Sequence, residues 1–289
     1  MKPNSNVSTY TAPNIMDKLI PYQAVHRTGD LISDISSDET KAQTARWFAE
    51  MMIKEFLSGE FSEESYKKLS LGDLISYLTE KVDKKIIDSL NFIKDFGDKA
   101  SHYNPDVKIT KTDSKKAVEA ALDLFSLIII DHLKKNPLDS HPDRATILST
   151  TLPKIRLKII GELIDFDDLS TDYQIGLLHK WCLACVKSGG REKVRRKLNN
   201  LQKKGKISKP IYDFEIKSVN EIAFRMSKSE LPIPFAHEDF ARNFDAVISQ
   251  LSAESKEINS RLIDILDRMA KHIQRSEFGG SRGMQVFLV

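Results

Sequence analysis

Apolar residues recur along most of this chain at intervals of three and four, and this spacing limits what the chain can fold into. Such a stripe marks one face of an amphipathic helix, whereas a half-buried strand alternates apolar and polar residues. Almost no segment of the 289 residues alternates in that way. The pattern therefore predicts an all-α protein. The predicted helices span residues 40–57, 71–81, 84–96, 115–134, 144–164, 171–187, 191–202, 219–226 and 238–273.

The segment at residues 136–142 is the strongest candidate for a domain boundary. It holds two prolines and several cap-forming residues, and it lacks an apolar stripe. We therefore expect a first helical domain over residues 15–136 and a second over residues 137–277. Residues 1–14 are polar and are expected to be disordered, and residues 278–289 are expected to form a flexible tail.

Several absences from the sequence bear on compartment and chemistry. No apolar run reaches the roughly 18 residues of a membrane span, and the N-terminal residues lack the apolar core of a secretion signal. The two cysteines cannot build a disulfide framework, which fits a reducing compartment. We therefore expect a cytoplasmic protein without membrane contact. The sequence contains no glycine-rich phosphate loop, and therefore no NTPase signature, and it contains no nucleophile elbow. We also expect no cofactor and no metal.

The charges of the chain are unevenly distributed, although the formal net charge is only +3. Residues 187–209 hold ten Lys or Arg and a single acid, Glu192. This segment therefore carries +9, and the rest of the chain carries −6. A local excess of positive charge points to nucleic acid or to another acidic partner.

An apolar seam divides the basic segment into two faces. Val194, Leu198 and Leu201 recur at i, i+4 and i+7, and we expect them to pack on the protein. The basic residues would then face solvent and could contact several phosphates, which gives salt-dependent binding with little sequence preference. A solvated face without a partner is the alternative. The predicted residues for binding RNA or DNA are Arg191, Lys193, Arg195, Arg196, Lys197, Lys203, Lys204 and Lys206.

A second candidate site lies at the predicted end of the third helix. Gly97 is expected to end this helix in a left-handed cap. An imidazole among carboxylates and ammonium groups could perform acid–base chemistry or hold a phosphate. In the alternative, the histidine only caps the helix, and its imidazole bonds to Asp95 or Asp98. The charged and titratable residues concerned are Lys94, Asp98, Lys99 and His102.

The order of motifs around this corner has a counterpart in a known family. The first predicted helix carries Ala45-Arg46, and the second opens with residues 70–75, Ser-Leu-Gly-Asp-Leu-Ile. The third runs into residues 97–102, Gly-Asp-Lys-Ala-Ser-His, and the fourth is apolar. Residues 40–135 resemble the HEPN superfamily, specifically its small uncharacterised domains that accompany restriction and phage-defence enzymes. Such domains usually show an arginine in the third helix, then Gly-Asn-Lys, two small residues and a histidine.

The resemblance implies either catalysis or binding. Active members of the superfamily are metal-independent ribonucleases, often dimers that pair two Arg/His motifs, whereas many relatives only bind or scaffold. It implies His102 as general acid or base, Lys94 and Lys99 on the phosphate, and Asp98 as the residue that orients the imidazole. Lys94 replaces a bidentate arginine by a point charge, and Asp98 adds negative charge where a phosphate would sit. Both departures favour a binding role.

A third cluster consists of His179, Cys182 and Cys185, which lie at i, i+3 and i+6 on one helix face. Zinc needs four ligands, or three and a water molecule, and the chain has no further cysteine. The segment 181–185 also resembles a dithiol redox motif, but such a motif belongs at a helix N-terminus. Buried structural cysteines are the preferred interpretation.

The sequence as a whole predicts a nucleic-acid-associated binding and oligomerisation module of a prokaryotic defence or restriction system. A protein partner or a homo-oligomer is expected besides the nucleic acid. Two alternatives stay open. One is a metal-independent endoribonuclease that uses His102, and the other is a protein–protein adaptor that binds no nucleic acid.

Overall fold

The regular structure of the described residues is helical throughout. In the computed structural model these residues form α-helices and short 3₁₀ helices, and none of them lies in a strand. The all-α prediction is therefore confirmed. The structure describes residues 18–62, 64–102, 108–231, 233–234, 236–271 and 273. The predictions for residues 1–14 and 278–289 lie outside this set. None of the described helices combines the length and the hydropathy that a membrane crossing needs.

The contacts group the chain into two compact units, Met1–Phe125 and Ser126–Val289. The division falls inside helix α5 (Lys111–Lys135) and not at residues 136–142, where the sequence placed it. The proline-containing segment belongs to the second unit because buried Arg144 holds it. Arg144 Nη1 donates to the Pro137 carbonyl (2.9 Å), and Arg144 Nε donates to Asn259 Oδ1 (3.0 Å). This segment is therefore an internal turn.

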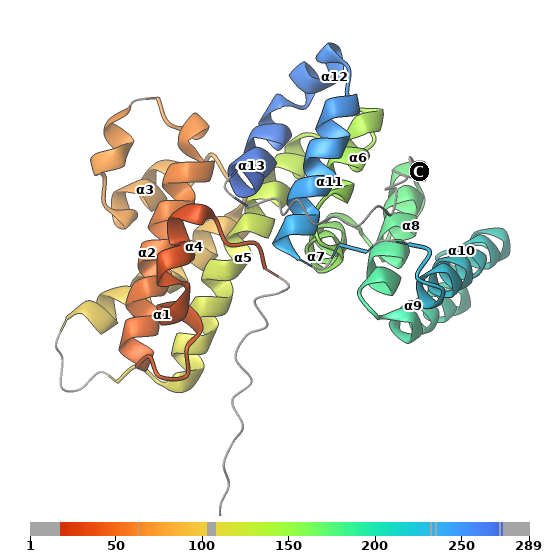
Figure 1. Cartoon of the computed structure of the whole chain (residues 1–289). Helices are drawn as coiled ribbons and strands as arrows, with labels where there is room; N and C mark the ends of the chain where they lie inside the picture. The colour runs from red at the N-terminus through yellow and green to blue at the C-terminus, as the bar shows by residue number, and fades with distance from the viewer. Residues whose placement is uncertain are drawn as a thin grey trace, which may run out of the picture. The chain divides into compact units, whose positions relative to one another are not determined.

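The first unit is a helical bundle centred on the pair α2 and α4 (Figure 1). The two helices bury a common set of apolar side chains that includes Phe48, Met52, Leu90 and Ile93. Helix α5 begins where the Thr110 hydroxyl accepts from the Asp113 amide (3.2 Å), slightly before the predicted first residue, 115. The helices of this unit are α1 (Thr28–Ile32), α2 (Asp38–Phe56), α3 (Leu71–Leu78), α4 (Lys84–Ser101) and the first part of α5.

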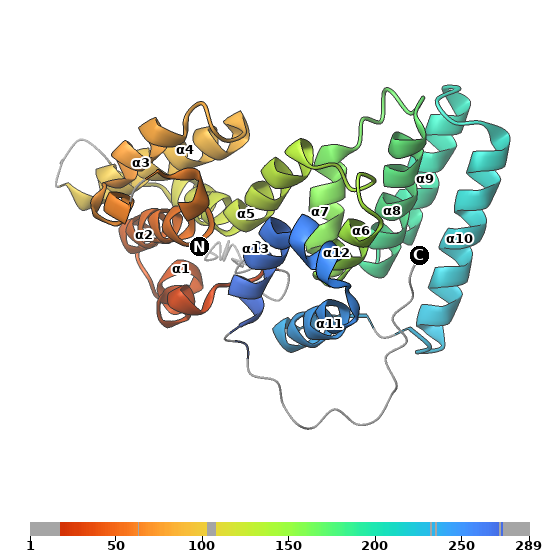
Figure 2. The same cartoon turned by 90° about the horizontal axis from the view of Figure 1, so that it is seen from above.

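The second unit contains the rest of α5 and a series of further helices. Helix α8 packs on α7, and α8, α9 and α10 lie side by side (Figure 1; Figure 2). The predicted helices 171–187 and 191–202 agree with α8 and α9 to within one residue at each end. The further helices are α6 (Pro142–Ser149), α7 (Pro153–Leu163), α8 (Asp172–Lys187), α9 (Arg191–Lys203), α10 (Lys209–Ser227), α11 (His237–Gln250), α12 (Ala253–Ile258) and α13 (Ser260–Ala270).

One predicted helix of this unit, over residues 144–164, is two helices. Pro153 occupies the first turn of α7, where its missing N–H costs nothing, but it cannot continue the preceding helix. Helix α6 therefore ends at Ser149. The hydroxyl of Thr150 donates to the Ile147 carbonyl (2.8 Å) and satisfies part of the helix end. The prediction was wrong here because it gave more weight to the apolar stripe than to the proline.

The predicted long helix 238–273 is three helices, α11, α12 and α13. Leu251 is extended, and Ser252 then caps α12 by accepting from the Ser255 amide (3.1 Å). Buried Asn259 separates α12 from α13 and donates from Nδ2 to the Ser255 carbonyl (2.9 Å). The apolar spacing survives both breaks, so the spacing by itself could not reveal them.

Candidate functional site

The corner at Gly97 differs from the predicted helix end. Helix α4 continues through Gly97 to Ser101, and Gly97 is buried inside it. A Cβ atom at this position would lie 2.4 Å from Arg46 Cβ and 2.5 Å from Arg46 Cδ of α2. The glycine is therefore required by the close approach of α2, not by a left-handed turn. The predicted cap at Gly97 is wrong.

Asp98 forms an ion-pair cluster with one residue of its own helix and one of α2. Its Oδ2 accepts from Lys94 Nζ at 2.8 Å, and Arg46 Nε lies 2.9 Å from its Oδ1. Burial raises the pKa of Asp98, but the hydrogen bond and charge of Lys94, together with Arg46, outweigh burial and hold the pKa below its usual value. The hydrogen bond with Asp98 also raises the pKa of Lys94. Two of the four predicted catalytic residues therefore neutralise each other.

His102 and Lys99 lie apart from this cluster and are exposed. His102 is the C-cap residue of α4, and its backbone N–H donates to the Asp98 carbonyl (3.2 Å). Among the described contacts, no hydrogen bond joins the His102 imidazole to Asp98, because both oxygens of that carboxylate face Arg46 and Lys94. The C-terminal end of a helix carries partial negative charge, which disfavours a phosphate and favours a cation. The geometry supports no acid–base pair at this corner.

The cluster on α8 is a packing arrangement. Cys182 and Cys185 are buried free thiols, which agrees with the structural interpretation. Burial raises the pKa of both thiols, and the Glu215 carboxylate raises that of Cys182 further, so neither is an activated nucleophile. His179 Nδ1 pairs with Glu215 Oε2 at 3.1 Å. Within the described part of the chain, no three His, Cys, Asp or Glu side chains gather closely enough to hold a metal ion.

Two partners in these clusters were missed by the sequence analysis. Arg46 lies on α2, and no local sequence pattern indicates that it pairs with Asp98 of α4. Glu215 lies 36 residues from His179 along the chain, and it is 1% exposed on α10. Glu215 shares a buried face with Val219 at i+4. A carboxylate on the apolar face of a helix is the signal that could have indicated this partner, because a buried charge needs a partner.

The basic segment forms α9, and its apolar seam packs as predicted. Val194, Leu198 and Leu201 are all buried, and α9 contacts α8 and α10 through this face. Gly190 precedes the helix and lies so close to Cys185 that an added Cβ would be 2.6 Å from its Sγ. The seam fixes which side chains of α9 face outward, because residues three and four apart share a face of the helix.

The side of α9 that faces α10 uses two of the predicted nucleic-acid-binding residues for internal contacts. Arg191 Nη2 donates to Asn220 Oδ1 of α10 at 2.8 Å. Arg195 Nη1 lies 3.5 Å from Glu192 Oε1 of its own helix, and Arg195 is half-buried. These two guanidinium groups are therefore partly committed to the protein.

The opposite side of α9 meets the loop between α7 and α8. Lys197 Nζ lies 3.7 Å from the centroid of the Phe166 ring, and burial lowers the pKa of Lys197. Lys206 Nζ, in the turn after α9, donates to the Asp167 carbonyl at 2.7 Å. The loop between α7 and α8 thus engages two further cations of the predicted set.

The remaining four predicted residues form one exposed cationic face. Successive residues of this set are three, seven and one positions apart in the sequence, so they lie along one side of α9 and at its C-terminal end. Exposed Asn200 lies on the same side. No described carboxylate lies within ion-pair distance of any of them. Arg196 Nε has only a weak contact with the backbone carbonyl of Glu192 (3.4 Å). This α9 face consists of Lys193, Arg196, Lys203 and Lys204.

No protein-family model, no curated protein and no solved structure matches the chain. The resemblance to the HEPN superfamily stays an expectation.

Proposed function

We propose that the protein binds nucleic acid through the α9 face. The observation that carries this proposal is the set of four exposed cations on one helix, without a carboxylate partner among the described residues. Mixed surface charges normally neutralise one another locally, as Lys209 and Asp213 do at 2.7 Å on α10. An unneutralised cationic face instead attracts a polyanion and releases its condensed counterions when it binds.

The length and rigidity of the α9 face suit a phosphate backbone. Residues 193–204 span about 16 Å at the rise of an α-helix. That distance covers roughly half a turn of a duplex, or a few phosphates of a single strand. The buried seam holds the helix in place, so the four side chains need only order their own rotamers on binding. Three of the four are lysines, which act as point charges and position a backbone without reading bases.

Binding measured against salt tests this proposal. A labelled RNA oligonucleotide and a labelled DNA duplex are titrated with the full chain at several salt concentrations, and binding is followed by fluorescence anisotropy. We expect the logarithm of affinity to fall linearly with the logarithm of salt. Replacing Lys193, Arg196, Lys203 and Lys204 together by Gln should reduce that slope by about 3, because each lost phosphate contact removes roughly 0.7–0.9.

The matched control removes four positive charges elsewhere. Lys67, Lys68, Lys84 and Lys116 are exposed lysines of the first unit, and their joint replacement by Gln should leave the slope nearly unchanged. An equal loss in both variants would show attraction by net charge only. No binding by the wild type would favour the protein adaptor. Cleavage of the RNA in chelator that disappears in His102→Ala would favour the ribonuclease.

The proposal has two further parts that rest on the HEPN resemblance. The module would oligomerise, and it would serve a prokaryotic defence or restriction system. Sedimentation of the full chain with and without the RNA tests the first part. A single monomeric species under both conditions would contradict it.

A further inference from the structure

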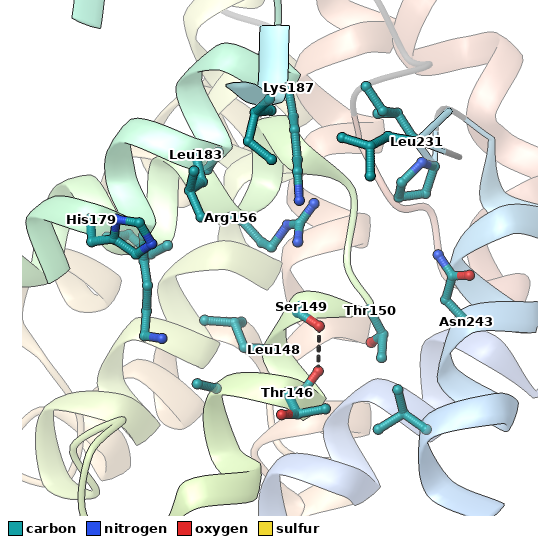
Figure 3. A pocket seen from close by; sticks show the side chains of 18 of the residues that line it. Thr146, Leu148, Ser149, Thr150, Arg156, His179, Leu183, Lys187, Leu231 and Asn243 are labelled. Carbon is teal, nitrogen blue, oxygen red and sulfur yellow. Dashed lines mark hydrogen bonds between the residues drawn. The ribbon is translucent and has the colours of Figure 1, made fainter. Parts of the chain in front are cut away.

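The second unit contains a cavity of about 260 Å³ that lies apart from the α9 face. Side chains of α6, α7, α8, α10 and α11 line it, together with the segment that follows α10. The wall includes the aliphatic side chains of Leu148, Leu183 and Leu231 (Figure 3), and those of Ile160 and Ile222. A concave site with an apolar wall and a few converging polar groups is the usual form of a small-molecule site.

The polar groups of this cavity are basic. Arg156 of α7 and Lys187 of α8 point toward one another inside it (Figure 3), and Lys180 and Arg225 also line it. No Asp or Glu is among the described residues of its wall. Arg156 Nε is buried and has no hydrogen-bond partner among the residues that the structure describes. Unlike the cations of α9, these groups converge on a concave space.

The burial of these positive charges next to one another is costly for the fold. Burial lowers the pKa of Arg156 to about 10. Burial, and then the positive charges of Arg156 and Arg225, lower the pKa of Lys187 to about 8. Like charges brought together away from water destabilise the fold unless an anion compensates them. A purely structural buried arginine has hydrogen-bond partners within the protein. Arg144 is an example, because its guanidinium donates to Asn259 and to the Pro137 carbonyl.

We propose that this cavity binds a small organic phosphate, with the phosphate between Arg156 and Lys187 and the apolar body against the aliphatic side chains of the wall. A phosphomonoester dianion matches two adjacent cations, whereas a carboxylate would leave one of them uncompensated. The guanidinium offers a planar pair of donors to two phosphate oxygens, and the ammonium adds a point charge. Aliphatic side chains that line the cavity, such as Leu183, Ile222 and Leu231, supply the contact that inorganic phosphate cannot use.

Calorimetric titration of the full chain with phenyl phosphate, benzoate and inorganic phosphate tests the proposal. Phenyl phosphate should bind saturably and more tightly than the other two. Arg156→Gln and Lys187→Met should each weaken phenyl phosphate binding roughly tenfold to a hundredfold, because each removes a charge-assisted contact. If Arg156→Gln does not fold, Lys187→Met still tests the proposal, because the methionine side chain preserves the packing of the aliphatic part of the lysine.

Controls separate this site from the α9 face. Lys84→Met, which removes an exposed charge in the first unit, should bind phenyl phosphate as the wild type does. The fourfold α9 variant should also keep this binding, even though it is expected to lose nucleic acid. Absence of saturable binding, equal affinity for benzoate, or unchanged affinity in both cavity variants would overturn the proposal. Loss of phenyl phosphate binding in the α9 variant would do the same.

Discussion

At the scale of single residues, two groups of charges differ in whether they have a counter-charge. Asp98 lies between Arg46 and Lys94, and each carboxylate oxygen faces one cation. Arg156 and Lys187 meet in a cavity without a described carboxylate. The first arrangement stabilises the fold, and the second trades stability for a place where an anion can bind. Stability measured against pH distinguishes them. The Asp98 charge contributes stability that is lost as the pH falls through the acidic range, whereas the Lys187 charge imposes a cost that is lost as the pH rises through the alkaline range.

Lys187→Met should stabilise the protein. The pKa of Lys187 is about 8 in the folded protein, whereas the pKa of an unperturbed lysine, as in the unfolded chain, is 10.5. Between pH 8 and pH 10.5 the unfolded chain therefore binds more protons than the folded protein. The cost of the charge is present in full below pH 8 and disappears as the pH rises to 10.5. We expect the variant to exceed the wild type by roughly 2 kcal/mol at neutral pH. Urea unfolding of both proteins at pH 7 and at pH 10 measures the difference.

The stability difference between Lys187→Met and the wild type should depend on pH and on the ligand. The advantage of Lys187→Met should shrink at pH 10, and it should shrink at pH 7 when phenyl phosphate is added to the wild type. Lys84→Met serves as the control and should show neither change. A variant less stable than the wild type at pH 7 would mean that Lys187 has a compensating partner.

Asp98→Asn should have the opposite effect. The pKa of Asp98 is lowered in the folded protein, so its charge contributes stability above the pKa of the unfolded chain, near 4, and this contribution is lost as the pH falls. The cluster is about one-third exposed, so we expect a loss of roughly 1 kcal/mol at pH 7. Unfolding at pH 7 and at pH 3 tests this prediction. Asp88→Asn, at an exposed position of the same helix, should change little, and an equal loss there would contradict the role of the cluster.

At the scale of elements, the pairing of α2 with α4 depends on one glycine. Gly97→Ala should destabilise the first unit by roughly 1–2 kcal/mol, because the clash with Arg46 Cβ outweighs the gain in helix propensity. Gly176→Ala is the matched control inside α8, where an added Cβ meets nothing within 4 Å. That variant should gain roughly 0.5–1 kcal/mol. Thermal unfolding of both variants checks the pair, and a stabilised Gly97→Ala would contradict the close packing of the two helices.

Some features of the helices could be predicted from the sequence, and others could not. The seam of α9 was predictable, because Val194, Leu198 and Leu201 bury the same face by spacing alone. The end of α4 was not, since Gly97 suits a left-handed cap as well as a close helix contact, and only the position of Arg46 decides between them. The breaks at Pro153 and Ser252 have local causes, and the sequence carries both signals.

At the scale of the whole molecule, the chain divides inside a helix. Continuous apolar helices such as α5 carry no composition change, so a sequence analysis places the boundary at the next proline-rich segment. Residues 136–142 lie within the second unit because Arg144 and Asn259 hold them there. The uneven charge of the chain is a property of the same scale, and the second unit holds both the α9 face and the basic cavity.

The sequence by itself determined the helical class, the placement of most helices, the buried seam of α9 and the local excess of positive charge. These properties follow from the spacing and composition of neighbouring residues. Only the tertiary structure decided which cations stay exposed, which partner holds Asp98, and that Arg156 and Lys187 share a cavity. The reason is physical: a charge is neutralised, buried or left open by residues that folding brings to it from elsewhere in the chain.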